Sequence, residues 1–309
     1  MSEEKNFSQK KGISDLLKKY RSQKDNVENE NTNQINIPKP QENTPNLQQF
    51  NHEEFEKAMS KETDPDLITT YEIVKLPSKG LFYKNGLSEI NVEYMTSKDE
   101  DLLTTSSLIE SGVVLDLLLK RKIKTPNVNP EDLLPGDRNA ILLFLRITSY
   151  GSDYTVQVTD PRTGVPFKTT VDLTKLKYKK IEEKPNDNGL FSVDLPMRKK
   201  NVLFKLLTVG EDTRIYKTAE SLKEAKNEEF SQYSTMRLVA SIVSIDGNTN
   251  KTYISKFVDA MPALDAYAIR KKMLDVSPDV DMDYVFTAKD GYTFNANLTI
   301  GLDFFFPSI

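Results

Sequence analysis

Hydrophobic residues are distributed unevenly along the chain. The first 60 residues hold many Asn, Gln, Glu, Lys and Ser residues and few aromatic or β-branched ones. Such a segment cannot bury enough apolar surface to offset the entropy that it would lose on ordering. We therefore expect a disordered polar tail over residues 1–66 and a folded body over residues 67–309.

One short amphipathic segment interrupts the polar tail. In a helix over residues 13–20, the apolar side chains fall on one face, and they are Ile13, Leu16, Leu17 and Tyr20. An isolated helix of this length is marginal in water. The segment is therefore either a transient helix within the tail or a docking motif that folds in the groove of a partner protein.

The body begins with a β pattern that gives way to helical spacing. Residues 73–83 predict a strand, a Pro-Ser-Lys-Gly turn and a second apolar segment, and residues 90–95 alternate with period two. Three segments with helical spacing follow, at residues 98–107, 112–121 and 137–149. Thr96 or Ser97 is the expected cap of the first helix and Asp137 that of the third. The sequence thus predicts a helical subdomain at about 96–150.

The rest of the chain mixes hairpins, strands and helices. Alternating segments on either side of Asp160-Pro-Arg-Thr-Gly164 predict one hairpin, and Ala288-Lys-Asp-Gly291 is the turn of a second. Further strands are expected at 191–195 and 201–207, further helices at 211–230 and 263–274, and either a helix or a strand at 234–243. The fold class is therefore α+β, with the helical subdomain beside a β-rich part made of 67–95 and 151–309.

The last residues of the chain are unusually apolar. Phe304, Phe305 and Phe306 stand directly before Pro307. Burying one such ring stabilises a protein by about 1.5–3 kcal/mol relative to leaving it in water. The rings therefore either pack on their own domain or anchor the chain in a partner, and truncation is harmful in both cases. These four residues, with Ile13, Leu16, Leu17 and Tyr20, are the candidate partner-binding residues.

The sequence offers little chemistry for catalysis or metal binding. Cysteine is absent, and the only histidine, His52, lies in the polar tail, so the body has no imidazole to activate a serine. Phosphate-binding and dinucleotide-binding glycine motifs are missing. Asp279, Asp281 and Asp283 alternate as in a calcium loop, but the later glycine and the glutamate at the twelfth position are missing. We expect a non-enzymatic protein without a cofactor or a metal site.

Charge and hydropathy also argue against nucleic acid and membrane as partners. The formal net charge is −4, and the basic clusters at 120–124 and 198–200 lack interleaved aromatics, so we interpret them as solvated faces. The longest apolar stretches, 111–119 and 140–147, are far shorter than the ~20 residues of a membrane span. The N-terminus has no signal-peptide core. The residues thus predict a soluble protein that acts by binding other proteins.

Several segments together resemble the baseplate hub and hub-assembly proteins of contractile-tailed bacteriophages. The segments that carry this resemblance are Leu76-Pro-Ser-Lys-Gly-Leu-Phe-Tyr83, residues 90–103, residues 112–119, Leu134-Pro-Gly-Asp-Arg138, Leu145-Arg-Ile-Thr-Ser-Tyr-Gly151 and the terminal Phe-Phe-Phe-Pro. The resemblance spans roughly residues 70–309, is loose over 152–295, and leaves the tail uncovered.

One departure from the family is informative. Relatives often carry paired cysteines at two hairpin turns, in an arrangement that resembles a zinc ribbon. The corresponding places in this chain look like residues 159–164 and 287–291, which hold no cysteine. If the two turns still meet, hydrogen bonding and packing must replace the metal. The resemblance therefore implies a zinc-ribbon-like module without zinc.

The resemblance implies a role in the baseplate hub, either as a structural component or as an assembly factor. The partners would be other baseplate or tail proteins, and the protein would be found in the virion tail, in the host cytoplasm during assembly, or in both. The alternatives are a tail assembly chaperone absent from the mature virion, a connector or other structural virion protein, and, more remotely, a metal-dependent hydrolase. Neither residues nor resemblance predict the oligomeric state.

Overall fold

The computed structural model describes residues 70–227, 229–288 and 290–306, which belong to one compact unit, Thr70–Ile309. The expected tail, residues 1–66, lies outside the described residues. Five of the candidate partner-binding residues therefore also lie outside them, namely Ile13, Leu16, Leu17, Tyr20 and Pro307.

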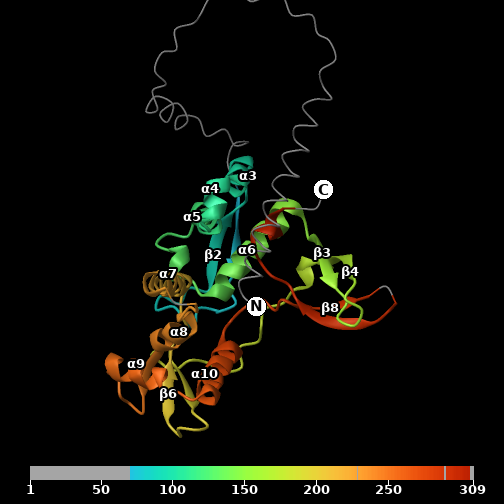
Figure 1. Cartoon of the computed structure of the whole chain (residues 1–309). Helices are drawn as coiled ribbons and strands as arrows, with labels where there is room; N and C mark the ends of the chain where they lie inside the picture. Colours follow the sequence, from blue (N-terminus) through green and yellow to red (C-terminus); the bar gives the residue numbers. More distant parts are fainter. Residues whose placement is uncertain (1–69, 228, 289, 307–309) are drawn as a thin grey trace, which may run out of the picture. The chain divides into compact units, whose positions relative to one another are not determined.

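The first part of the body joins a two-stranded sheet to a run of helices (Figure 1). Strands β1 (Tyr71–Lys75) and β2 (Glu89–Glu93) pair in antiparallel fashion. The helices that follow are α3 (Ser97–Thr104), α4 (Ser106–Glu110), α5 (Val114–Lys122), the 3₁₀ turn η2 (Pro130–Asp132) and α6 (Pro135–Tyr150). Helices thus lie where the spacing predicted them, except that the first is divided because Thr105 has an extended backbone.

Helix α6 begins and ends for reasons that are visible in its sequence. Pro135 occupies the first helical position, where its missing N–H is not needed, and Gly151, at φ 81°, follows the last turn. The N-cap is Leu134, so the prediction that Asp137 caps this helix is wrong. Asp137 lies inside the first turn, where its carboxylate is buried and binds another segment instead of its own helix end.

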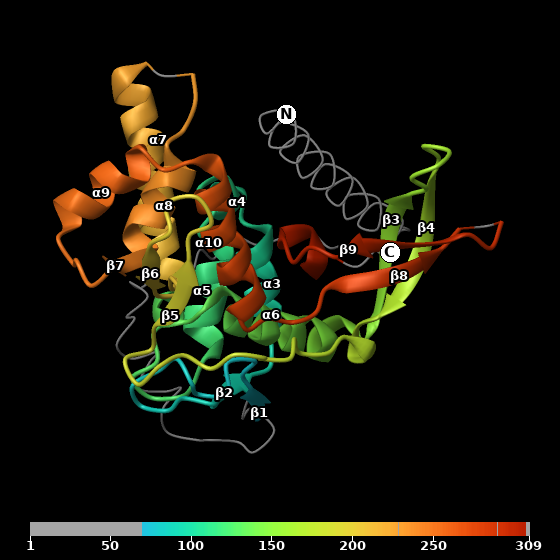
Figure 2. The same ribbon diagram turned by 90° about the horizontal axis from the view of Figure 1, so that it is seen from below.

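Two antiparallel hairpins follow α6 and end the described chain. The first consists of β3 (Asp153–Thr159) and β4 (Pro166–Asp172), which leads into the 3₁₀ turn η3 (Leu173–Lys175). The second consists of β8 (Asp283–Thr287) and β9 (Thr293–Asn297), followed by the 3₁₀ turn η4 (Leu302–Phe305). Figures 1 and 2 show the two hairpins side by side. The rings of Phe167 on β4 and Phe294 on β9 meet edge-to-face between the two hairpins, with their centres 6.2 Å apart.

The chain between the two hairpins forms a small sheet covered by helices. Strands β5 (Phe191–Asp194), β6 (Asn201–Phe204) and β7 (Ile242–Ile245) pair in antiparallel fashion in that order. The helices are α7 (Val209–Lys226), α8 (Tyr233–Ser241), α9 (Lys251–Asp259) and α10 (Ala263–Val276). The ambiguous segment 234–243 is both helix and strand, because α8 passes directly into β7.

Buried apolar residues form two main clusters within the body. The larger one combines both ends of the described chain, and its members include Val74, Ile90, Leu118, Leu142, Val171, Phe286 and Phe304. The second lies among β5–β7 and α8–α10, and its members include Val202, Leu238, Ile242, Ile254 and Ile269. Helices and small antiparallel sheets thus pack together in one body, which confirms the α+β prediction.

Candidate functional site

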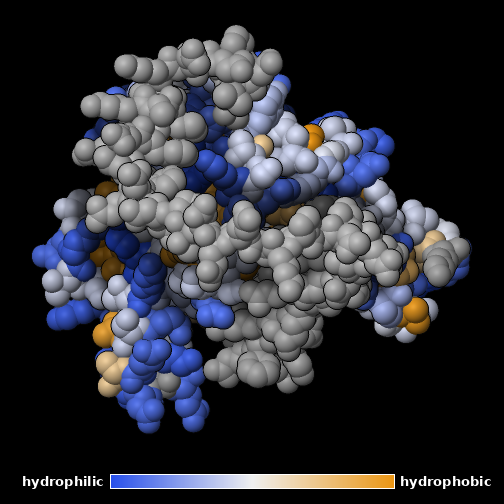
Figure 3. Space-filling model, turned by 90° about the horizontal axis from the view of Figure 1, so that it is seen from above, coloured by the Kyte–Doolittle hydropathy of each residue, from blue (hydrophilic) through white to orange (hydrophobic). Residues whose placement is uncertain are grey.

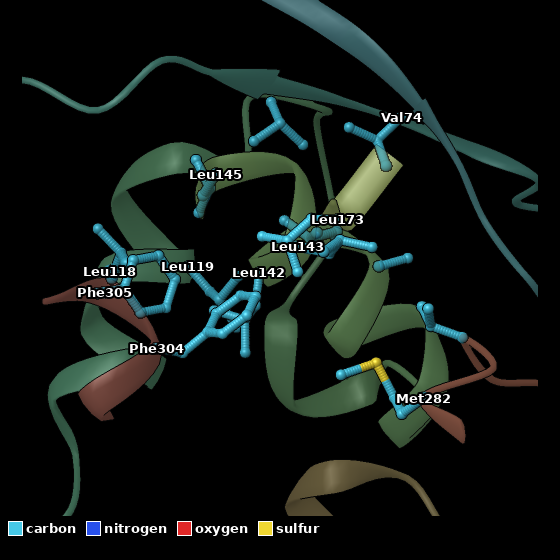
Figure 4. Packing of buried hydrophobic residues seen from close by; sticks show 14 of the residues in the cluster. Val74, Leu118, Leu119, Leu142, Leu143, Leu145, Leu173, Met282, Phe304 and Phe305 are labelled. Carbon is cyan, nitrogen blue, oxygen red and sulfur yellow. The ribbon is translucent and has the colours of Figure 1, made fainter. Parts of the chain in front are cut away.

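The C-terminal aromatic rings lie in the core of their own chain. Phe304 and Phe305 are both 0% exposed, and Figure 4 shows them among Leu118, Leu119 and Leu142. Phe306 is only partly buried and packs against the same cluster. Of the two alternatives for these residues, the structure therefore places Phe304 and Phe305 in the one in which they pack on their own domain. A fully buried ring is not accessible to a partner in this conformation.

A buried arginine fastens this C-terminal segment. Arg146 of α6 is 1% exposed, and its Nε donates to the carbonyl oxygen of Phe304 at 2.8 Å. Its other guanidinium nitrogens donate to the carbonyl oxygens of Gly151 at 2.8 Å and Asp153 at 3.2 Å. One planar guanidinium thus joins η4 to the junction between α6 and β3. A lysine ammonium lacks the fixed planar arrangement of N–H donors that makes these three hydrogen bonds.

Aromatic rings surround the same guanidinium. Its carbon lies 5.5 Å from the ring centre of Tyr150, 5.6 Å from that of Tyr154 and 5.9 Å from that of Phe304. Burial lowers the pKa of Arg146 and raises the pKa of Tyr154 to about 12. No carboxylate of the described residues forms an ion pair with Arg146, so the ring faces and backbone carbonyls stabilise its charge. Sequence reasoning missed this residue, although a single cation in the apolar run 140–147 was a visible signal.

A second buried polar group joins two of the family-like segments. The carboxylate of Asp137 is 0% exposed and accepts the backbone N–H of Ser78 at 2.9 Å and the hydroxyl of Tyr83 at 2.5 Å. The Tyr83 oxygen in turn accepts the N–H of Leu134 at 2.9 Å. Residues 76–83 and residues 134–138, far apart in sequence, are therefore held together at the start of α6.

The electrostatics of this contact follow from its burial. Burial raises the pKa of Asp137, the nearby carboxylate of Asp279 raises it further, and the hydrogen bonds from Tyr83 and Ser78 oppose the rise. Burial and the Asp137 carboxylate also raise the pKa of Tyr83. The Asp137 carboxylate and the Tyr83 hydroxyl are both used in hydrogen bonds that join residues 76–83 to the start of α6, so the contact is a structural link.

The glycine beside Asp137 is required by a close backbone approach. A Cβ on Gly136 would lie 2.0 Å from the carbonyl oxygen of Pro278, which is far too close. The same segment is tied to α6 by the side-chain amide of Asn139, which donates to Asp279 at 3.1 Å. Arg138 forms an ion pair with Asp116 of α5 at 3.0 Å. The Leu134–Arg138 motif thus fixes contacts to three other parts of the body.

The basic cluster at 120–124 is occupied by ion pairs within the chain. Lys122, with a side chain only 3% exposed, lies 2.7 Å from Asp99 and 3.0 Å from Glu93. Lys120, Arg121 and Lys124 pair with Glu131, Asp99 and Glu93 respectively. The interpretation of this cluster as a solvated face is therefore wrong for Lys122, because the buried Asp99 draws it into the body.

Asp99 shows how local and tertiary contacts combine. It forms a capping box with Thr96 at the start of α3, as the sequence predicted for Thr96, and it also binds Lys122. Burial alone would raise the pKa of Asp99, but hydrogen bonds from Lys122 and Thr96 outweigh it and lower the pKa. Asp99 and Asp137 are thus both buried, yet their pKa values shift in opposite directions, because only Asp99 has a cation beside it.

The two hairpin turns that resemble cysteine-bearing turns do meet in space. Arg162 of the first turn forms an ion pair with Asp160 of the same turn at 3.0 Å. It forms a second ion pair with Asp290 of the other turn at 2.7 Å. Its guanidinium also lies over the ring of Tyr292, 3.7 Å from the centre. The hydrogen bonds from Arg162 lower the pKa of Asp160 and of Asp290. An arginine therefore links the turns by ion pairs and ring stacking.

The described residues do not fit a zinc site at these turns. Four thiolates or imidazoles would be needed, and the sequence of both turns supplies neither. Across the described ranges, no group of three or more His, Cys, Asp or Glu residues is arranged to hold a metal ion. In the acidic run, Asp281 accepts the N–H of Asp283, and Asp283 accepts the amide of Asn297.

Comparison with known families places this arrangement in a biological context. The family model described as T4 bacteriophage base plate protein matches residues 68–306. The chain belongs to this base plate family. The searches of curated proteins and of solved structures found no match. The matched region contains all the segments that meet at Asp137, Asp99 and Arg146, and it excludes residues 13–20.

Membership of the base plate family determines the setting of the protein. It is a structural protein of a phage baseplate, found in the virion tail, and it contacts other tail or baseplate proteins. A structural family of this kind implies a role without catalysis. In the described part of the chain, no helix has the length and apolar character of a membrane span.

Contacts of a base plate protein with its neighbours must be made on its surface. Figure 3 shows one face on which the described residues are largely hydrophilic, with a few isolated hydrophobic patches. Three elements each carry more than one exposed apolar side chain. Tyr71 and Ile73 lie on β1, Tyr216 and Leu222 lie on α7, and Leu264, Tyr267 and Leu274 lie on α10. Sequence reasoning singled out none of these groups, because all three lie in segments that predicted ordinary strands and helices.

Proposed function

We propose that this base plate protein acts in the central hub of the baseplate, as a structural component on which other tail proteins assemble. The observation that supports this most is the role of the hub-like segments. Residues 76–83, 134–138 and 145–151, which carry the resemblance to hub proteins, supply the buried contacts at Asp137 and Arg146. The segments that carry the resemblance therefore make the buried contacts that hold the body together, and they are not scattered over its surface.

A rigid body with a separate docking segment suits such a role. The body presents a fixed surface, because its family-like segments are joined by buried hydrogen bonds and ion pairs. Ile13, Leu16, Leu17 and Tyr20 form the docking motif in the tail, which binds the groove of a neighbouring tail protein. Phe306 and Pro307 add to the contact surface, whereas Phe304 and Phe305 stabilise the body.

Quantitative mass spectrometry of purified phage particles and of infected-cell lysate tests the hub assignment. A hub component is present in purified particles at a few copies each, in a fixed ratio to other baseplate proteins. If the protein is found only in the lysate, it is an assembly chaperone and not a hub component. A copy number that matches a head-to-tail connector would instead place the protein outside the hub.

The docking motif has its own test. The double substitution Leu16→Asp and Leu17→Asp removes the apolar face of residues 13–20, and we expect incorporation into particles to fall by about tenfold or more. Lys18→Gln combined with Lys19→Gln lowers the net charge by the same two units outside that face and is the matched control. Equal incorporation of both variants would show that the motif does not dock.

A further inference from the structure

Helix α10 carries apolar side chains on two opposite faces. Its inner face packs against the body through Ile269, in the second cluster, and through Val276, which packs with Phe191 and Phe204; the two residues are 0% and 4% exposed. Its outer face carries Leu264, Tyr267 and Leu274, which are 52%, 56% and 64% exposed. A helix that is apolar all round is normally covered on all sides. Within the described residues, nothing covers the three side chains of this outer face.

The three exposed side chains lie along one side of the helix, with Lys271 between Tyr267 and Leu274, and form an apolar stripe. With Lys271 they occupy positions i, i+3, i+7 and i+10, which fall on the same side of an α-helix. This is the spacing by which a helix packs against a second helix. Scattered apolar residues on a surface are ordinary, but an aligned set with a tyrosine between two leucines has the composition of a binding surface.

The charges on the same face indicate the kind of partner. Arg270 and Lys271 are exposed beside the stripe, and no acidic side chain of the described residues forms an ion pair with either. The next residue differs, because Lys272 turns aside and pairs with Glu183. Asp275 is the only acidic residue on the exposed side of α10. The outer face is therefore an apolar stripe with two available cations at its centre.

A second copy of α10 would fit this stripe poorly. In an antiparallel pair centred on Ile269, Leu264 of each copy would meet Leu274 of the other, which is favourable. The same pairing would bring Arg270 and Lys271 of both copies together in the middle, and a parallel pair would do the same. Because like charges placed opposite each other across an interface are strongly unfavourable, the face disfavours self-association and favours an acidic partner.

We propose that the outer face of α10 binds an amphipathic helix of another tail protein, with apolar residues at three- and four-residue spacing flanked by Asp or Glu. The apolar residues of that helix cover Leu264, Tyr267 and Leu274, and its carboxylates pair with Arg270 and Lys271. This proposal deepens the hub function, on which it rests for the identity of the partner as a tail protein. It names the surface that the body contributes.

Site-specific photo-crosslinking tests the proposal in infected cells. The full chain carries p-benzoylphenylalanine in place of Tyr267, a similar ring at the centre of the stripe, and cross-linked peptides are identified by mass spectrometry. We expect a peptide of another tail protein with an acidic amphipathic helical pattern. Placing the cross-linker at Tyr216, which is 47% exposed on α7, is the matched control and must not yield the same peptide.

Charge variants make the test specific. Combining Arg270→Glu with Lys271→Glu should lower the cross-linking yield at position 267 by about tenfold or more, whereas Arg270→Lys with Lys271→Arg should preserve it. All variants should unfold at the same temperature, because both side chains are exposed.

Three results would overturn the proposal. They are a cross-link to a second copy of this chain, a cross-link to a basic or extended segment, and no cross-link from position 267 in cells that assemble normal particles. The last result would leave the hub function intact if mass spectrometry finds the chain in those particles. Absence of the chain from the particles would instead contradict the hub function.

Discussion

The C-terminal rings and the outer face of α10 are both apolar, but they differ in every other respect. Phe304 and Phe305 lie in an irregular segment at the end of the chain, and the body surrounds them completely. Leu264, Tyr267 and Leu274 lie in a regular helix that is followed by a further hairpin, and more than half of each residue is exposed.

The two groups of apolar residues differ in how the surrounding structure binds the segment that carries them. Arg146 binds the Phe304 carbonyl oxygen, so the segment that carries the rings has a polar attachment as well as an apolar pocket. Helix α10 already uses Ile269 and Val276 to attach itself, and its outer stripe adds nothing to that attachment. Apolar residues that fold the protein and apolar residues that are free for a partner are thus distinguished by their neighbours and not by their type.

The largest effect is expected at the C-terminal rings. Phe304→Ala or Phe305→Ala leaves a cavity in the main core and should lower the free energy of unfolding by about 3–5 kcal/mol. Urea unfolding followed by circular dichroism measures this loss. A loss below about 1 kcal/mol would mean that the rings do not belong to the core and would restore their role as anchors.

The next effect concerns the polar attachment of the same segment. Arg146→Met fills similar space but removes the guanidinium donor from the buried carbonyl oxygen of Phe304 and from the partly buried contacts to Gly151 and Asp153, so we expect a loss of about 3 kcal/mol. Arg146→Lys keeps the charge without the fork of donors and should lie between Met and wild type. Urea unfolding curves of wild type and the two variants measure this order of stability. Equal stability of Arg146→Lys and wild type would show that the planar guanidinium is not required.

A moderate effect with a distinctive pH dependence is expected at Asp137. Asp137→Ala leaves the Ser78 N–H and the Tyr83 hydroxyl without their acceptor, which should reduce stability by about 1–3 kcal/mol. Because burial raises the pKa of Asp137, the folded state holds its proton to a higher pH than the unfolded state. The contribution of this group is therefore greatest below the ordinary pKa of aspartate and declines as pH rises towards the raised value.

The substitution Asp137→Asn isolates the pH dependence of stability that comes from Asp137. The asparagine does not titrate, so the difference in unfolding free energy between wild type and Asp137→Asn should fall as pH rises above about 4. The lowered pKa of Asp99 gives a contribution of the opposite sign, which is lost as pH falls, and it cancels in this difference because both proteins contain Asp99. A difference that rises with pH would show that the pKa of Asp137 is not raised.

The smallest effect on stability is expected on α10. Leu264→Ser and Leu274→Ser should each change the free energy of unfolding by less than about 0.5 kcal/mol, because both side chains already face water. The same substitutions should abolish cross-linking at position 267. A large loss of stability would mean that the outer face is part of the body's own packing, which would remove the contrast with Phe304 and Phe305.

Much of the fold could be predicted from local pattern, and the exceptions have specific causes. Period-two alternation located β2 and the first hairpin, the turn Ala288-Lys-Asp-Gly291 located the second hairpin, and helical spacing located α5 and α6. Asp137 was predicted to cap a helix that in fact begins two residues earlier, at Pro135, because an acidic residue near a helix start looks the same whether it caps its helix or binds a distant loop. The segment 234–243 stayed ambiguous because its apolar run suits both α8 and β7.

The candidate site was less predictable than the fold. The sequence located Phe304 and Phe305 and offered two alternatives, between which only their burial decides. It gave no reason to choose Arg146, whose three carbonyl partners come from Gly151, Asp153 and Phe304. Nor did it distinguish Lys122, which is buried beside Asp99, from the exposed lysines around it.

By itself the sequence determined the α+β composition, the position of most helices and strands, the lack of thiolate chemistry and the resemblance to phage baseplate proteins. These properties depend on residue type and on spacing over a few positions, which the chain carries without folding. Only the tertiary structure decided that the two hairpin turns meet through Arg162, that the C-terminal rings are buried and that the outer face of α10 is not. Those properties depend on which distant segments come together, because burial and ion pairing belong to contacts and not to single residues.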